Sequence, residues 1–131
     1  MSVAFAEPAV AEHDPGRALV RLLVEYRGRL EAVREVAVDA ARKRSQMNST
    51  QPPSLDIADQ MTDACQMFDV IEPAADNLVR HASQWLDHSA PRGSAEEFEL
   101  SVRLAEFEAL LKKTSAAVAE VRSLAVDDVP F

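Results

Sequence analysis

The chain has 131 residues, a net charge of −8 and 47% hydrophobic residues, which is typical of a single soluble globular domain. An acidic surface repels phosphate backbones and anionic headgroups, so we expect neither nucleic acid nor a membrane surface as a partner. No stretch of the chain has the length and apolar character of a membrane span, and its first residues lack the charge and apolar run of a secretory signal. These features predict a cytoplasmic protein.

Alanine is the commonest residue, with 22 copies against three glycines, and this composition favours helices. Arginine outnumbers lysine 11 to three, which points weakly to a GC-rich bacterial genome. The single cysteine, Cys65, excludes an internal disulfide and has no companion with metal-ligand spacing. We therefore expect an all-α protein without a disulfide framework.

The first predicted helix covers residues 15–47. Asp14 is a suitable N-cap, and Pro15 suits the first helical position, where no amide hydrogen is needed. Core positions then follow a three- and four-residue spacing through Leu19, Leu23, Tyr26, Leu30, Val33, Ala37, Ala40, Arg44 and Met47. Only the arginine interrupts this apolar series, so one side of the helix is predicted to face its neighbours.

The second predicted helix covers residues 55–89, after a polar loop that ends in the candidate cap Ser54. Its core positions are Ile57, Met61, Ala64, Phe68, Ile71, Ala75, Leu78, Ala82 and Trp85. Pro73 lies inside this series and removes one backbone hydrogen bond. Because the spacing keeps its phase across the proline, we expect a kink and not a break.

The third predicted helix covers residues 95–126. Ser94 followed by Glu97 forms the capping-box pattern, in which each side chain accepts a backbone amide of the other residue. Its core positions are Leu100, Leu104, Phe107, Leu111, Thr114, Val118, Val121 and Ala125. Thr114 is the only polar member of the series.

The predicted fold is all-α: an antiparallel up-down-up bundle of three long helices. Residues 14–126 make its single domain, residues 1–13 and 127–131 are tails, and the second helix is expected to be central because its apolar side is the widest. Charge supports the packing, since residues 14–48 carry a net +3 and residues 54–90 a net −6. Basic side chains of the first helix are therefore expected to pair with the second helix.

Two histidines and the only tryptophan, His81, Trp85 and His88, share one side of the second helix. The histidines are seven residues apart, which is too far for a single metal ion, and no Glu-x-x-His pattern of a di-iron bundle is present. We expect no metal and no cofactor. A small-molecule pocket near His81 and Trp85 remains an alternative.

Several apolar residues fall outside the core series: Val24, Val38, Val70, Phe98 and Val102. Scattered exposed apolar residues are normal, but together these are candidates for a contact surface. With no phosphate loop, nucleophile elbow or cofactor motif in the sequence, we do not expect an enzyme. The favoured hypothesis is a homodimeric interaction protein, an adaptor or a chaperone-like module that also binds another protein. The alternative hypothesis is a small-molecule sensor.

Overall fold

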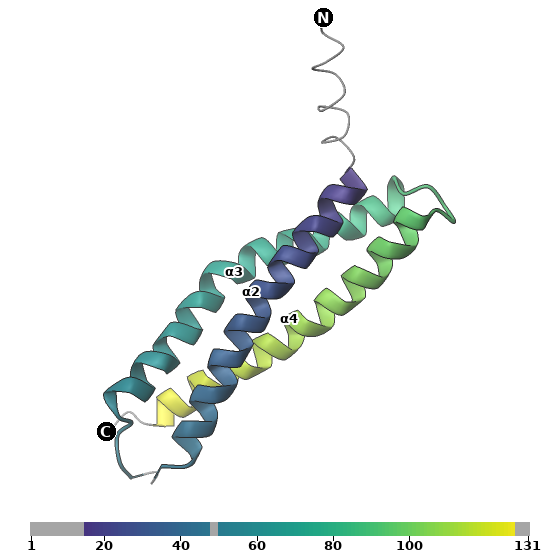
Figure 1. The fold of residues 1–131 in the computed structure, drawn as a ribbon. Coiled ribbons are helices and arrows are strands. Elements are labelled where there is room, and N and C mark those ends of the chain that lie inside the picture. Colours follow the sequence, from purple (N-terminus) through teal and green to yellow (C-terminus); the bar gives the residue numbers. More distant parts are fainter. Residues whose placement is uncertain (1–14, 48–49, 128–131) are drawn as a thin grey trace, which may run out of the picture.

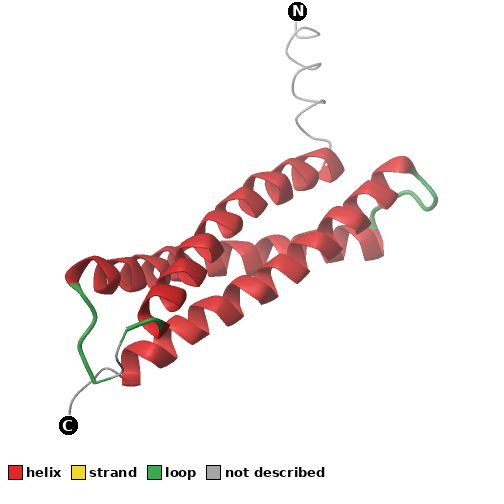
Figure 2. Cartoon of the chain, turned by 60° about the horizontal axis from the view of Figure 1, so that its bottom comes forward, coloured by secondary structure: helices red, strands yellow, loops and turns green. Residues whose placement is uncertain are grey.

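The computed structural model describes residues 15–47 and 50–127. They form three long helices, α2 (Pro15–Ser45), α3 (Leu55–His88) and α4 (Ala95–Asp127), which pack against one another. The described residues contain no strand, as Figure 2 shows. The prediction of an all-helical bundle of three long helices is confirmed. The candidate cap Asp14 and the predicted tail 1–13 lie outside the described residues.

The helix ends differ slightly from the predicted ones. Helix α2 ends at Ser45 instead of residue 47, because the Met47 amide bonds to the Arg44 carbonyl at 3.1 Å in a tighter turn. Helix α3 ends at His88, where the Ser89 amide bonds to the Trp85 carbonyl. Helix α4 continues to Asp127, a residue that the sequence assigned to a tail.

Both serine caps are present. The Ile57 amide donates to the Ser54 hydroxyl at 3.3 Å, and the Glu97 amide donates to the Ser94 hydroxyl at 3.1 Å. The Glu97 carboxylate accepts from the amide of Gly93 at 2.7 Å, one residue before the predicted donor. Gly93 has φ +78°, a conformation that glycine adopts without strain.

Pro73 lies near the middle of α3 and is exposed, and the helix is continuous through it. The ribbon of α3 curves along its length in Figure 1. The expectation that the proline does not break the helix is therefore confirmed. Exposure explains why it is tolerated, since water can bond the carbonyl that the proline leaves without an amide donor.

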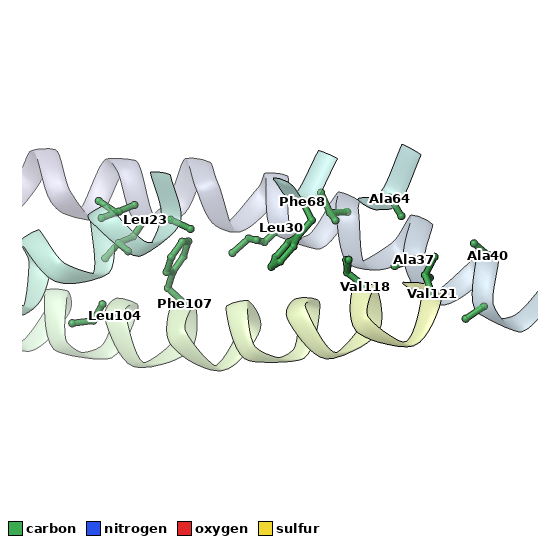
Figure 3. Packing of buried hydrophobic residues seen from close by; sticks show 14 of the residues in the cluster. Leu23, Leu30, Ala37, Ala40, Ala64, Phe68, Leu104, Phe107, Val118 and Val121 are labelled. Atoms are coloured by element: carbon green, nitrogen blue, oxygen red, sulfur yellow. The ribbon is translucent and has the colours of Figure 1, made fainter. Parts of the chain in front are cut away.

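The core lies along the common axis of the three helices. Its largest fully buried side chains include Phe68 of α3, Phe107 of α4 and Leu30 of α2, which meet between the helices in Figure 3. The polar core positions are also buried, with Arg44 at 5% and Thr114 at 0% exposure. The heptad assignment thus identifies most of the core, but Ala125 is exposed and seven positions of the series are only partly buried: Leu19, Tyr26, Met47, Ile57, Ile71, Trp85 and Leu111.

The expectation that the second helix is central is wrong. Contact is most extensive between α2 and α4 and least extensive between α3 and α4. The wide apolar side of α3 includes Cys65, Val79 and Leu86, which are only partly buried. The number of apolar residues on one side of a helix therefore does not predict how much of that side a neighbouring helix covers.

Candidate functional site

The three residues flagged on α3 lie near its C-terminal end. His81 and His88 are exposed, whereas Trp85 is half-buried and packs against the core. A Cβ atom added at Gly16 of α2 would lie 2.8 Å from Cη2 of the Trp85 ring. The tryptophan therefore fills the contact between the start of α2 and the end of α3, and the exposed histidines are not enclosed with it.

The five flagged apolar residues lie on all three helices, and Val70 of α3 is 77% exposed. Val24 and Val38 of α2 are 48% and 46% exposed, and Phe98 and Val102 of α4 are 73% and 40% exposed. Val38 lies at the seam between α2 and α4, where it lines shallow grooves that also include Leu110 and Ala117. Phe98 and Val102 are four residues apart, so they share one side of α4.

That side of α4 continues beyond the two flagged residues. Exposed apolar side chains recur at spacings of three, four and seven residues, and we call this series the outer face of α4: Phe98, Val102, Ala105, Ala109 and Ala116. The buried positions of the same helix, from Leu100 to Val121, lie on the opposite side. Helix α4 is therefore apolar on two sides, of which only one faces the core.

The sequence reading missed the three alanines of this face. Alanine favours a helix at any position, so its presence outside the core series does not by itself mark a contact surface. The signal is nevertheless present, because Phe98, Val102 and the three alanines follow the spacing of the core series two residues further along the chain, with Lys112 in the one remaining position.

A second feature is an apolar groove between α3 and α4, which we call the α3–α4 groove. It has a volume of about 580 Å³ and is lined mainly by Pro53, Ala58, Met61, Cys65, Val121 and Ala125. Small side chains on both helices leave this space open. It lies at the end of the bundle where α3 begins and α4 ends, far along α3 from Trp85 (Figure 1).

Arg122 lies at the edge of this groove and forms an ion pair with Asp69 of α3. Partial burial disfavours the charged guanidinium, but the hydrogen bond to Asp69 and its negative charge outweigh that effect and raise the pKa of Arg122 above its ordinary value. Cys65 is close enough to contribute in the same direction. The ion pair therefore links α3 to α4 beside the α3–α4 groove.

The most strongly perturbed carboxyl group is Asp39 of α2. The side-chain amide of Gln60, on α3, donates to it at 2.8 Å, and the ammonium of Lys43 lies 3.0 Å away. These two bonds and a third from Arg42 hold the pKa of Asp39 well below its usual range. Because Gln60 also donates to the Val36 carbonyl, this cluster links α2 to α3.

The expected pairing of basic α2 side chains with α3 is wrong for the ion pairs found among the described residues. Arg27 pairs with Glu106 of α4 at 3.5 Å, while Arg29 and Lys43 pair within α2. The acidic residues of α3 lie mainly on its solvent side, out of reach of α2. Net charge per segment therefore did not identify the partners.

Among the described residues, no three His, Cys, Asp or Glu side chains gather closely enough to hold a metal ion. Within the same residues, no helix combines the length and the apolar character needed to cross a bilayer. Comparison of the chain with protein-family models, with curated proteins and with solved structures finds no match. The outer face of α4 and the α3–α4 groove are therefore the two candidate functional sites.

Proposed function

We propose that this protein is a non-enzymatic helical module that binds protein through exposed apolar surface, and that it forms a homodimer. The observation that carries the proposal is the outer face of α4, on which Phe98 is 73% exposed. A helix that is apolar on two sides is typical of a helix covered on two sides. Contiguous exposed apolar surface commonly marks a protein contact.

Charge narrows the choice of partner. The net charge of −8 disfavours anionic partners such as nucleic acid and phospholipid headgroups. An adaptor or chaperone-like role in a bacterial cytoplasm agrees with this composition. A second copy of the chain is the simplest partner, since closed two-fold dimers are the commonest assemblies.

We also infer the up-down-up order of the helices within each copy. Contacts near both ends of the α2–α3 pair support it: Gly16 lies beside Trp85, and Val36 lies beside Gln60. The loops joining the helices lie at opposite ends of the bundle in Figure 1, which agrees with this order.

Static light scattering on the purified chain tests the dimer. We expect twice the mass of 14.4 kDa at ~50 µM protein, because a functional contact between copies should be populated at that concentration. Phe98→Ser should lower the measured mass, whereas Val70→Ser, a matched change of an exposed apolar residue on α3, should not. A monomer mass for the unmodified chain at ~50 µM would contradict the homodimer.

The α3–α4 groove favours a second candidate function, the binding of a small apolar ligand. Its volume of about 580 Å³ and its mainly apolar lining lie within the range of small-molecule sites. The probe is 1-anilinonaphthalene-8-sulfonate, a fluorescent dye with apolar aromatic rings and one anionic sulfonate group. Ala58→Trp, which fills the groove, should abolish dye fluorescence, and the control Ala32→Trp on α2 should not. Equal fluorescence of the two variants would contradict this function.

A further inference from the structure

The outer face of α4 is long and narrow. Phe98 and Ala116 are 18 residues apart, which corresponds to about 27 Å along the helix axis. Every residue of the face is exposed, while the opposite side of the helix is buried in the core. A partner that covers this face therefore has to lie along α4, as a helix does.

The order of residue sizes along the face is asymmetric. The large side chains, Phe98 and Val102, stand at its start, and alanines occupy its middle and its end. In a parallel pair of α4 helices, each phenylalanine would meet the other. In an antiparallel pair centred on residue 107, Phe98 meets the partner's Ala116, Ala105 meets the partner's Ala109, and Val102 meets the aliphatic stem of the partner's Lys112. The second arrangement matches large with small and lets the helices approach closely where both carry alanine.

Charge along α4 supports the same direction. The first turns carry Glu96, Glu97 and Glu99, and the lysines Lys112 and Lys113 lie further along the helix. Glu99, Lys112 and Lys113 make no ion pair with other described residues. An antiparallel pair brings Glu99 within one turn of the partner's Lys113, whereas a parallel pair would place like charges together.

Glu106 and Glu108 flank the centre of the pair, and Glu106 is already balanced. Glu106 lies 3.5 Å from the guanidinium of Arg27 and 3.8 Å from that of Arg103. Two copies of Glu106 can therefore approach the two-fold axis with an arginine beside each of them, which reduces the repulsion between them.

From these observations we infer that two copies of the chain associate through the outer faces of α4, antiparallel, with a two-fold axis between Ala105 and Ala109. Each Phe98 then packs over the partner's Ala116, and each Glu99 lies beside the partner's Lys113. This inference rests on the proposed homodimer and specifies its interface. The dimer interface is formed by one segment of α4 from each copy, and each segment is about 27 Å long.

Disulfide trapping tests the interface and its direction. Single-cysteine chains are made in the Cys65→Ser background, with Phe98→Cys or Ala116→Cys, and are oxidised mildly, alone and as an equimolar mixture. The mixture should form covalent dimers at least about 10-fold faster than either chain alone, because a disulfide needs Cα atoms within about 7 Å. In the antiparallel pair, each cysteine lies far from its own copy in the partner.

A second pair keeps the phenylalanine in place. A mixture of Ala105→Cys and Ala109→Cys should also cross-link faster than either chain alone. Ala32→Cys, exposed on α2, provides the matched control, and its mixture with Ala116→Cys should not cross-link. Rapid self-linking of Phe98→Cys or Ala116→Cys alone would show a parallel pair and overturn the inference.

Light scattering and cross-linking together distinguish an incorrect interface from the absence of a dimer. If light scattering shows a dimer but neither mixture cross-links, the interface is wrong and the proposed homodimer stands. If light scattering shows a monomer at ~50 µM and nothing cross-links, both are wrong. Cross-linking of both mixtures, with none of the control, supports both.

Discussion

Two polar residues occupy core positions, and each has a local hydrogen bond that makes its burial possible. The Thr114 hydroxyl donates to the Leu110 carbonyl of its own helix at 2.7 Å. The Arg44 guanidinium donates to the Gln51 carbonyl at 3.1 Å, which ties the end of α2 to the following loop. Because buried polar groups are costly when they lack partners, these hydrogen bonds reduce the cost of burying the two side chains.

Two glycines of α2 provide a matched pair for a stability test. Gly28 is exposed in the middle of the helix, and a Cβ atom added there meets nothing within 4 Å. Gly28→Ala should therefore stabilise the protein by about 0.5–1 kcal/mol, the usual gain from alanine in a helix. At Gly16, the added Cβ atom would lie 2.8 Å from the Trp85 ring. Gly16→Ala should destabilise the protein, because the ring or the start of α2 must move.

Urea denaturation of the two variants measures these changes, and emission of Trp85, the only tryptophan, reports the local one. We expect a shifted emission maximum for Gly16→Ala in the folded state and an unchanged one for Gly28→Ala. Equal stabilisation by both substitutions would show that Trp85 does not pack on the start of α2.

Asp39 predicts how stability depends on pH. Its hydrogen bond to Gln60, together with Lys43 and Arg42, lowers its pKa in the folded protein below the ordinary value of 3.8. The folded state therefore binds a proton at this site less readily than the unfolded chain does. The stabilisation from Asp39 is fully present above pH 3.8 and is lost as the pH falls below it.

Nuclear magnetic resonance titration of the Asp39 carboxyl group checks this prediction. In the unmodified chain the pKa should lie well below 3.8, and Gln60→Ala should raise it toward that value by removing the largest contribution. Stability measured between pH 5 and pH 2 should fall less steeply in Asp39→Asn, which cannot titrate. A pKa of Asp39 that is unchanged by Gln60→Ala would contradict the assigned cause.

At the scale of the element, the helices could be predicted because their signals are local. Ser54 and Ser94 begin α3 and α4 as their cap patterns indicate, and each cap depends only on residues within four positions along the chain. The end of α2 was missed by two residues, since Arg44 and Met47 continue the heptad spacing into a tighter turn that no local signal marks. Spacing alone therefore predicts that a helix exists better than it predicts where the helix ends.

Pro73 supplies the prediction at this scale. Proline inside a helix costs up to ~3 kcal/mol relative to alanine, and Pro73 is exposed, so alanine meets no obstacle there. Pro73→Ala should therefore raise stability in a urea melt by up to that amount and leave self-association unchanged. Asp76→Ala, on the same helix and also exposed, is the control and should change stability by less than ~0.5 kcal/mol. A less stable Pro73→Ala would mean that the curve of α3 is needed for packing.

At the scale of the whole molecule, the packing of the helices could not be predicted from their apolar sides. Leu111 has core spacing and Val79 belongs to the wide apolar side of α3, yet both line a groove between α3 and α4 and are only partly buried. The α3–α4 groove is a separate groove between the same two helices and lies nearer the other end of the bundle. A groove remains between two helices where their small and large side chains do not fill the space between them. The heptad spacing within one helix does not contain that information.

The outer face of α4 is only partly predictable from the sequence. A sequence pattern shows that Phe98 and Val102 lie outside the core series, but only the packed bundle shows that Ala105, Ala109 and Ala116 are exposed beside them. Alanine fits equally well into a core, onto a solvent-exposed helix surface or between two closely packed helices. Its role is therefore decided by its neighbours, which are known only once the helices are placed.

Self-association through the outer face of α4 should make the melting temperature depend on protein concentration. Association of folded chains stabilises them by mass action, so Tm should rise between ~5 µM and ~200 µM protein. Ala109→Glu places a charge at the centre of the face and should abolish this rise. At ~5 µM its Tm should match that of the unmodified chain, because Ala109 is exposed within a single copy. Ala32→Glu, the same change at an exposed position on α2, should keep the rise. A rise that survives in Ala109→Glu would place the contact on another surface of the bundle.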